Sequence, residues 1–89
     1  MIQKKVIVNN RAGLHTRPAA TLVKKASKYK CEFYIDRDGF RVNGQSIIGV
    51  MTLAAEQGTE LILEFNGPDE FAASEDLFNY FERGFDEAY

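Results

Sequence analysis

Residues 12–20 read Ala12-Gly13-Leu14-His15-Thr16-Arg17-Pro18-Ala19-Ala20, and this segment joins a turn signal to the start of a helical pattern. The apolar residues of the stretch recur at i, i+3, i+4 and i+7, the spacing of one helical face: Ala19, Leu22, Val23 and Ala26. Pro18 suits the first turn of a helix, where a missing N–H costs no hydrogen bond, and Arg17, as the residue before proline, is expected at the cap. The pattern predicts a helix from about Arg17 to Ser27, with its boundary at Thr16 or Arg17.

His15, the single histidine of the chain, lies just outside the predicted helix start. A helix start exposes unpaired backbone N–H groups and the positive end of the dipole, which together stabilise an anion. Free imidazole titrates near pH ~6.5, so much of it is neutral and nucleophilic near neutral pH without a general base. A phosphoryl group on His15 would lie within reach of the helix-start amides, from Thr16 onward, and of the Arg17 guanidinium, while Gly13 permits a sharp turn before the ring. These residues predict a phosphate site; the alternative is a polar surface histidine beside a helix cap.

The 89 residues are expected to form one domain, spanning 1–89, with one core. Hydrophobic residues make up 45% and aromatic residues 12%, and no segment approaches the ~18 consecutive apolar residues of a membrane span. Met1–Val8 lacks the apolar length and cleavage site of a signal peptide, so we expect a cytoplasmic protein that does not bind membranes. The single cysteine, Cys31, excludes an internal disulfide, and with one histidine it provides no zinc ligand set. Cys31 alternates with Phe33 and Ile35, which indicates core packing on a strand.

The charge of the chain is unevenly distributed. A net charge of −2 argues against a dedicated nucleic-acid binder, whose affinity rests on excess basic residues. Basic residues nevertheless crowd the first third: Lys4, Lys5, Arg11, Arg17, Lys24, Lys25, Lys28 and Lys30. From Glu56 onward acids dominate, and Arg83 is the one base. This asymmetry indicates a basic face for an acidic protein partner, unless these side chains are simply solvated.

Hydrophobic periodicity and turn residues predict the remaining elements. The expected strands are Met1–Val8, with Val6 and Val8 in phase, then Cys31–Arg37 and Phe40–Asn43 joined by the hairpin signal Asp38-Gly39, and a fourth strand over Leu61–Phe65. A short helix is expected within residues 44–57, ended by Gly58. The last helix is expected to begin after Gly67-Pro68-Asp69. Its aromatic residues recur at helical spacing and are expected to face a sheet: Phe71, Phe78, Phe81 and Phe85. The order β-α-β-β-α-β-α predicts an α/β (α+β) two-layer sandwich with an antiparallel sheet.

Two motifs carry a resemblance to a known family. Gly13-Leu14-His15-Thr16-Arg17-Pro18-Ala19 resembles the active-site motif of HPr, the histidine-containing phosphocarrier family of the bacterial sugar phosphotransferase system. Val42-Asn43-Gly44-Gln45-Ser46-Ile47-Ile48-Gly49-Val50-Met51 resembles the regulatory-serine segment of that family, at the usual distance from the histidine motif. The similarity runs over essentially all 89 residues. It implies an open-faced β-sandwich, a four-stranded antiparallel sheet covered on one face by three helices.

The resemblance also implies a function. Phosphoenolpyruvate-dependent enzyme I would phosphorylate Nδ1 of His15, which would hand the group to an EIIA-type component, with Arg17 stabilising the transferred group. Such a protein is a shuttle that shares catalysis with its partners. We expect it to act as a monomer, without a cofactor or a metal.

Ser46 precedes an apolar helical stretch, and a serine in that place predicts an ordinary N-cap. The resemblance adds that this residue matches the serine phosphorylated by HPr kinase/phosphorylase, a modification linked to binding of a transcription regulator. Phosphoserine adds about −1.5 to −2 charges at a helix start, which the helix tolerates but an acidic partner would not. Binding would then fall without unfolding.

The second helix is apolar on nearly every side, so one small core cannot cover it. Val50, Leu53 and Ala54 are expected to face the core. The family's docking surface implies an exposed patch of Ile47, Ile48 and Met51, flanked by Ala20 and Lys24 of the first helix, although a packing role for Met51 stays open. Thr16 and Gln45 depart from the family pattern, which often has alanine after the histidine and a lysine or other long residue before the serine.

Other functions remain as alternatives. One is a regulatory module, phosphorylated on Ser46, that binds a transcription regulator without sugar transport; the presence of His15 and Arg17 argues against a purely serine-based paralogue. A nitrogen-branch phosphocarrier is a closer variant. A third is a small sandwich that binds anions noncovalently at its first helix.

Overall fold

The computed structural model describes residues 1–87, and it confirms the predicted fold class. The elements in chain order are β1 (Ile2–Ile7), α1 (Thr16–Ala26), β2 (Glu32–Arg37), β3 (Phe40–Asn43), α2 (Ile47–Thr52), β4 (Glu60–Asn66) and α3 (Glu70–Glu82), followed by a short turn at Gly84–Asp86. The strands form one antiparallel sheet in the order β1-β4-β2-β3. None of the helices within residues 1–87 is long and apolar enough to cross a membrane.

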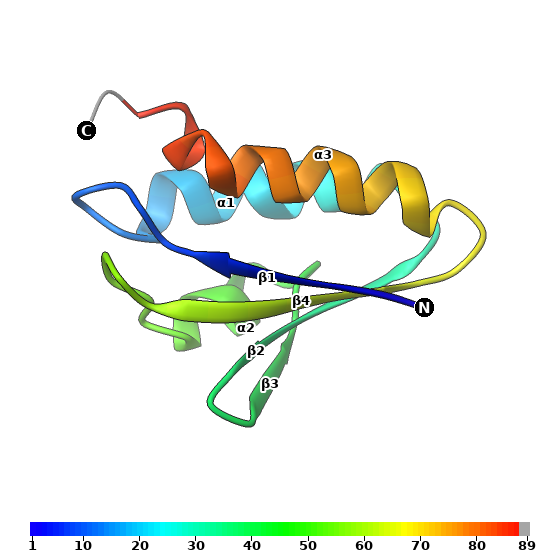
Figure 1. Ribbon diagram of the computed structural model, residues 1–89, viewed down its shortest axis with the longest axis horizontal. Coiled ribbons are helices and arrows are strands. Elements are labelled where there is room, and N and C mark those ends of the chain that lie inside the picture. Colours follow the sequence, from blue (N-terminus) through cyan, green and yellow to red (C-terminus); the bar gives the residue numbers. More distant parts are fainter. Residues whose placement is uncertain (88–89) are drawn as a thin grey trace.

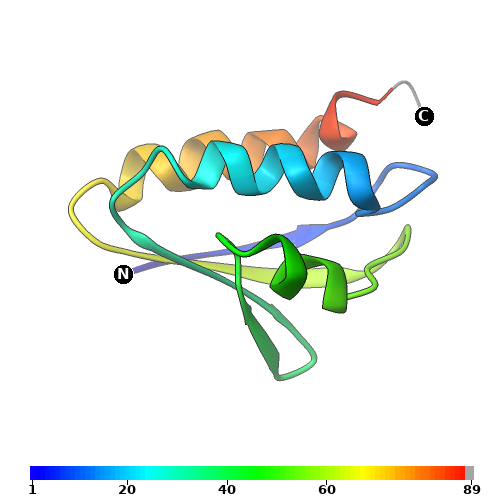
Figure 2. The same ribbon diagram turned by 180° about the vertical axis from the view of Figure 1, so that it is seen from behind.

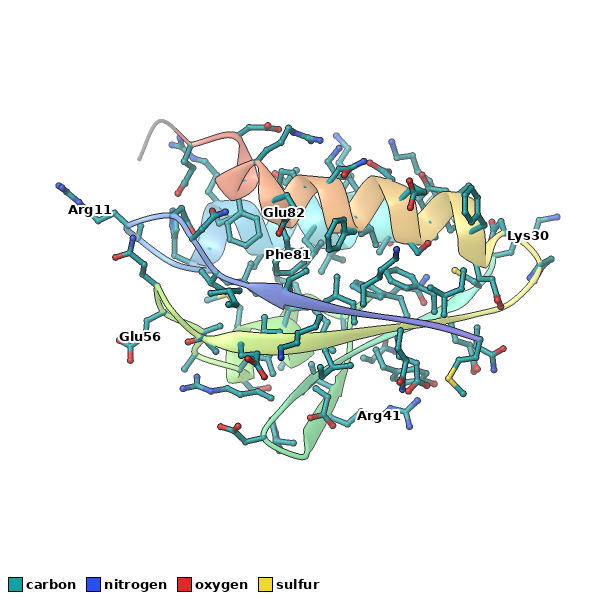
Figure 3. The ribbon with its side chains drawn as sticks, viewed as in Figure 1. Arg11, Lys30, Arg41, Glu56, Phe81 and Glu82 are labelled. Atoms are coloured by element: carbon teal, nitrogen blue, oxygen red, sulfur yellow. The ribbon has the colours of Figure 1, made fainter. Side chains whose placement is uncertain are left out.

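The molecule has two layers. Helices α1 and α3 lie side by side over one face of the sheet, and α2 lies lower, beside β3 (Figure 1). The reverse view shows α1 in front of α3, with the start of α1 at the end of the molecule where β1 leaves the sheet (Figure 2). Phe81 projects from α3 toward the sheet, whereas Arg41 lies on the opposite side of the sheet (Figure 3). One face of the sheet therefore carries the core and the other stays open.

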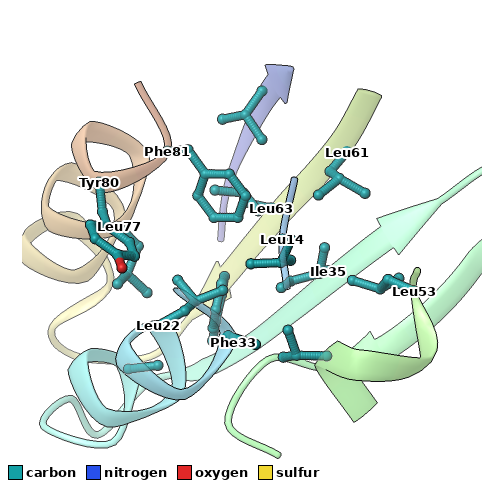
Figure 4. Packing of buried hydrophobic residues seen from close by; sticks show 14 of the residues in the cluster. Leu14, Leu22, Phe33, Ile35, Leu53, Leu61, Leu63, Leu77, Tyr80 and Phe81 are labelled. Carbon is teal, nitrogen blue, oxygen red and sulfur yellow. The ribbon is translucent and has the colours of Figure 1, made fainter. Parts of the chain in front are cut away.

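The core is formed by the alternating residues of the strands and the inner faces of the helices. On β4, Leu61, Leu63 and Phe65 are fully buried, while Ile62 and Glu64 face the open side. The sheet residues meet Leu22, Leu77 and other helical side chains (Figure 4). Phe33 and Phe65, cross-strand partners on β2 and β4, stack with their ring centroids 4.8 Å apart. Each such aromatic ring buries a large apolar area, the main source of stability here.

The hairpin between β2 and β3 follows its sequence signal. Asp38 and Gly39 both have positive φ, 52° and 87°, as a two-residue hairpin turn of the primed type requires. The carboxylate of Asp36 accepts the N–H of Gly39 at 2.8 Å.

Cys31 lies just before β2 and is buried, 2% exposed, as expected for a core residue. Burial, with the neighbouring Asp69 carboxylate, raises the pKa of its thiol to about 11. The thiol is therefore protonated and unreactive near neutral pH.

The helix ends match the predictions only in part. Helix α1 begins at Thr16, one of the two predicted boundaries, with His15 as its N-cap. Arg17, which was expected at the cap, lies inside the first turn, because the restriction on a residue before proline is a bias that the helix overrides. Helix α2 ends at Thr52, not at Gly58. Ala54, with a φ of 48°, turns the chain away from the helix, and Gly58 instead belongs to the turn before β4. Ala54 is exposed, so the expectation that it covers the core was also wrong.

The predicted aromatic stripe of the last helix is only partly correct. Phe81 is buried and Phe78 packs at the edge of the core, but Phe71 is 70% exposed and Phe85 lies beyond the helix. Phe71 precedes the buried Ala73 by two residues, roughly 200° around the helix, so it faces solvent.

Replacement of Leu77 and of Phe71 by alanine should show the difference between a core residue and an exposed residue of α3. Leu77→Ala removes a fully buried side chain and should lower the free energy of unfolding by about 2–5 kcal/mol. Phe71→Ala should change it by no more than about 0.5 kcal/mol. Urea unfolding followed by circular dichroism measures both, and an equal loss in the two variants would contradict this packing.

Candidate functional site

The loop between β1 and α1 fixes the position of His15. The N–H of Leu14 donates to the carbonyl of Ala55 at 2.8 Å, and the Leu14 side chain is buried. Gly13 has a φ of 75°, and a Cβ there would lie 2.7 Å from that same carbonyl oxygen. Position 13 therefore requires glycine for two reasons: its φ is positive, and there is no room for a Cβ next to the Ala55 carbonyl. His15 follows immediately and emerges at the boundary between core and solvent.

His15 is the N-cap of α1, with an extended backbone at φ −86° and ψ −171° and no side-chain capping bond. Pro18, at the third helical position, has no N–H, so it removes one of the donors that a capping side chain would satisfy. The amides of Thr16 and Arg17 have no acceptor within the helix. Both residues are exposed, and the His15 side chain is 40% exposed. The structure thus brings a half-exposed imidazole next to a helix start and an arginine.

The imidazole of His15 contacts a residue that the sequence did not indicate, Glu87. Nε2 of His15 lies 2.7 Å from Oε2 of Glu87, 72 residues further along the chain. The other carboxylate oxygen, Oε1, accepts a 2.6 Å hydrogen bond from Nδ2 of Asn10. The hydrogen bond with His15, the bond from Asn10 and the nearby charge of Arg17 hold the pKa of Glu87 below its ordinary value. Glu87 is therefore ionised near neutral pH.

A left-handed turn brings Glu87 back to the site. Gly84, Phe85 and Asp86 all have positive φ, between 59° and 64°. For Phe85 and Asp86 this conformation costs roughly 1–2 kcal/mol each, which burial of the Phe85 ring against Phe81 and Tyr80 offsets. A glycine directly after the C-cap residue, here Gly84, is a recognised signal for the end of a helix. No local pattern, however, predicts that the chain after this glycine returns to His15.

The second motif lies at the start of α2. Ser46 is the N-cap, and its Oγ accepts the N–H of Gly49 at 3.2 Å, as expected for a capping serine. The Gln45 side chain donates to the carbonyls of Ala26 and Cys31, at 3.1 Å and 3.2 Å. Gln45 thus ties the start of α2 to the end of α1, which gives this departure from the family pattern a structural role.

The apolar side chains of this segment divide between core and solvent as expected, with Ala54 as the exception. Val50 is buried, whereas Ile47, Ile48 and Met51 are 39%, 75% and 39% exposed. Ala20 and Lys24 are exposed on α1, which contacts α2. We call Ile47, Ile48 and Met51 the α2 patch.

A shallow hollow of about 350 Å³ connects the α2 patch to the histidine. Its lining includes His15, Met51 and Glu56. Glu56 and Arg11 lie at one end of the molecule and Lys30 at the other (Figure 3). Met51 is therefore the residue of the α2 patch that shares the hollow with His15. Within residues 1–87, no group of three or more His, Cys, Asp or Glu side chains is arranged to hold a metal ion.

Comparison with known proteins agrees with this geometry. The family described as "PTS HPr component phosphorylation site" matches residues 2–83. The phosphocarrier protein HPr of Treponema pallidum is 47% identical over 87 residues, which cover 98% of this chain and 99% of that protein. The crystal structure of HPr-C-His from Thermoanaerobacter tengcongensis, 36% identical, superimposes with a TM-score of 0.96 over the full length of both chains.

A third similar structure is that of Crh, a catabolite repression protein of Bacillus subtilis, described as a domain-swapped, intertwined dimer. It is 40% identical, with a TM-score of 0.76, over 94% of this chain and 97% of that one. The fold and the family match over residues 2–83 together define the class of small HPr-type phosphocarrier domains. This chain belongs to the HPr family of the phosphotransferase system.

Proposed function

We propose that this protein carries a phosphoryl group on His15, which it accepts from phospho-enzyme I and passes to EIIA-type components of the phosphotransferase system. The observation that carries the proposal is the placement of the imidazole at the start of α1, half exposed and next to Arg17. Membership of the HPr family supports it. In the transfer, the lone pair of a ring nitrogen forms a bond to phosphorus as the bond to the donor breaks, and the electron pair of that bond stays with the donor.

The start of α1 provides the electrostatic stabilisation. The amides of Thr16 and Arg17 and the positive end of the helix dipole favour the negative charge of the phosphoryl oxygens. The Arg17 guanidinium can donate hydrogen bonds to those oxygens. Because all these groups are open to solvent, their stabilisation is moderate, which suits a group that must be passed on.

The α2 patch, with Ala20 and Lys24, is the proposed docking surface for enzyme I and EIIA-type partners. The exposed Ile48 gives a partner an apolar contact on α2, and Met51 of the same helix lines one hollow with His15. Lys24 and the other bases of α1 complement an acidic partner and speed the encounter.

Ser46 is the proposed regulatory site, modified by HPr kinase/phosphorylase. Its position at the N-cap of α2 lets a phosphoryl group add negative charge beside the α2 patch without opening the core. The charge would repel an acidic partner and favour a different one, such as a transcription regulator. The similarity to Crh supports this regulatory branch as the second candidate function, whereas the presence of His15 and Arg17 favours the carrier.

The working form we propose is a cytoplasmic monomer in which the four strands of one chain make up the sheet. The domain-swapped dimer of the Crh structure is the alternative assembly. Light scattering of the purified protein distinguishes the two.

Replacement of His15 should abolish phosphate acceptance. With enzyme I and phosphoenolpyruvate, the unmodified chain should gain one acid-labile phosphoryl group by intact mass, and His15→Ala should gain none while melting at the same temperature. Arg17→Ala should slow acceptance roughly ten- to hundredfold, the value of one or two charge-assisted hydrogen bonds. Lys28→Ala, which removes an exposed charge beyond the far end of α1, is the control. Unchanged acceptance by His15→Ala would refute the proposal.

Ile48→Ser should weaken binding of enzyme I about tenfold, because it removes an exposed apolar contact from the proposed docking surface. Ile7→Ser, at a residue of β1 that is 51% exposed, provides a matched change outside the α2 patch and should have less than a twofold effect. Titration calorimetry measures both affinities. Equal effects in the two variants would remove the α2 patch from the docking surface.

Ser46→Asp should weaken the same interaction while the fold is retained, because aspartate is a good N-cap and adds charge where phosphoserine would. Ser46→Asn caps the helix equally well without the charge and should bind as the unmodified chain does. If the asparagine variant loses as much affinity as the aspartate variant, charge is not the cause.

A further inference from the structure

We propose that Glu87 is a positioning residue for this reaction: its carboxylate keeps the ring proton of His15 on Nε2 and so leaves Nδ1 as the nitrogen that takes the phosphoryl group. The inference rests on the proposed carrier function. It assigns a role to a residue outside both sequence motifs, in the segment that follows the left-handed turn.

Glu87 and the His15 ring are in direct contact. Oε2 of Glu87 lies 2.7 Å from Nε2 of His15, a hydrogen-bond distance. An ionised carboxylate has no proton to donate, so the ring nitrogen must be the donor. A neutral imidazole carries one N–H, and when Nε2 holds it, Nδ1 keeps its lone pair. The partner on one nitrogen therefore selects the nucleophilic atom on the other.

Asn10 holds the carboxylate in place. The Asn10 side chain is 2% exposed, and its Nδ2 lies 2.9 Å from the carbonyl oxygen of Gly13 and 2.6 Å from Oε1 of Glu87. Because both neighbours are acceptors, the amide must present its NH₂ group to them. Among the described residues no donor reaches Oδ1 of Asn10. The molecule leaves one buried oxygen unsatisfied, a cost that the two bonds made by Nδ2 offset.

The backbone that carries Glu87 is held by hydrogen bonds and by packing. Nδ2 of Asn9 donates to the carbonyl of Glu82 at 3.1 Å, and Phe85 is buried against α3. The N–H of Glu87 donates to the carbonyl of Gly84 at 3.1 Å. These contacts restrain the backbone of the turn, and the bond from Asn10 gives the carboxylate a second partner besides the histidine.

The role fits a balanced transfer. Nδ1 forms the N–P bond as the bond from phosphorus to the donor breaks, and the proton on Nε2 stays where it is. Electron density leaves the ring toward phosphorus, and the carboxylate stabilises the positive charge that develops. Glu87 neither touches the phosphoryl group nor gains a proton. The reverse transfer, to an acceptor, restores the same tautomer.

Glu87→Gln gives a sharp test, because the amide should reverse the preference. Asn10 donates toward Oε1, so the glutamine should turn its carbonyl to Asn10 and its NH₂ group to His15. Nε2 would then have to accept, which places the ring proton on Nδ1. Nitrogen-15 NMR of the imidazole, recorded at alkaline pH where the nitrogen shifts no longer change with pH, reports which nitrogen of the neutral ring is protonated.

In the unmodified chain we expect Nε2–H to exceed Nδ1–H by at least about tenfold, the effect of one charge-assisted hydrogen bond. Glu87→Gln should shift this ratio at least tenfold toward Nδ1–H, and Glu87→Ala should reduce the preference without reversing it. Glu56→Gln, which removes a carboxylate from the hollow next to His15 but not one bonded to its ring, should leave the ratio unchanged. Phosphate acceptance at Nδ1 should be slower in Glu87→Ala than in the unmodified chain, and slowest in Glu87→Gln.

A ratio unchanged by both Glu87 variants would overturn the inference, as would an unmodified chain with its proton on Nδ1. The NMR result does not require phosphoryl transfer. If the unmodified chain is never phosphorylated by enzyme I but its tautomer responds to Glu87, the carrier function fails and the positioning effect stands. If phosphorylation proceeds and the tautomer does not respond, only the role of Glu87 fails.

Discussion

The site depends on one anchor, the residue before the histidine. Leu14 is bonded through its backbone to Ala55 and buried through its side chain, so the chain is fixed at the point where it leaves the core. Helix α1 then starts at once, with the N–H of Ala19 bonded to the carbonyl of His15. The backbone of His15 is consequently fixed at the start of α1, while the imidazole ring stays accessible to solvent. This arrangement supplies orientation without burial, which a group that reacts with large partners needs.

Local signals predicted most of the fold because they act through the backbone or through alternation. Asp38-Gly39 has few choices other than a tight hairpin, and the alternating residues of β4 fit only a half-covered sheet. Prediction from hydrophobic spacing fails at Phe71. A large aromatic residue at nearly helical spacing is consistent with a core, but its angular position is decided by the neighbouring helix residues that reach the sheet. The end of α2 was missed for a similar reason, since a non-glycine residue, Ala54, adopts the positive φ that was expected of Gly58.

The candidate site divides in the same way. His15, Thr16 and Arg17 are adjacent in sequence, so the helix start brings them together whatever the rest of the chain does. Ser46 likewise needs only its own helix. Glu87 reaches His15 through a long-range path, in which two non-glycine residues adopt left-handed conformations because Phe85 is buried. The conformational preferences of Phe85 and Asp86 disfavour that turn and tertiary packing favours it, so no local pattern predicts it.

The strand order has a consequence for how the molecule is made. The first strand pairs with the last, Val6 opposite Leu61, and β4 also pairs with β2, so β4 is the strand that completes the sheet. During synthesis β1 has no partner until β4 has left the ribosome, and folding must close a long loop before the sheet can form. Through that interval β1 is an unpaired strand whose backbone N–H and C=O groups have no partner in the sheet. Assembly of the sheet is thus tied to synthesis of the chain as far as Asn66, because β4 supplies the partner of both β1 and β2.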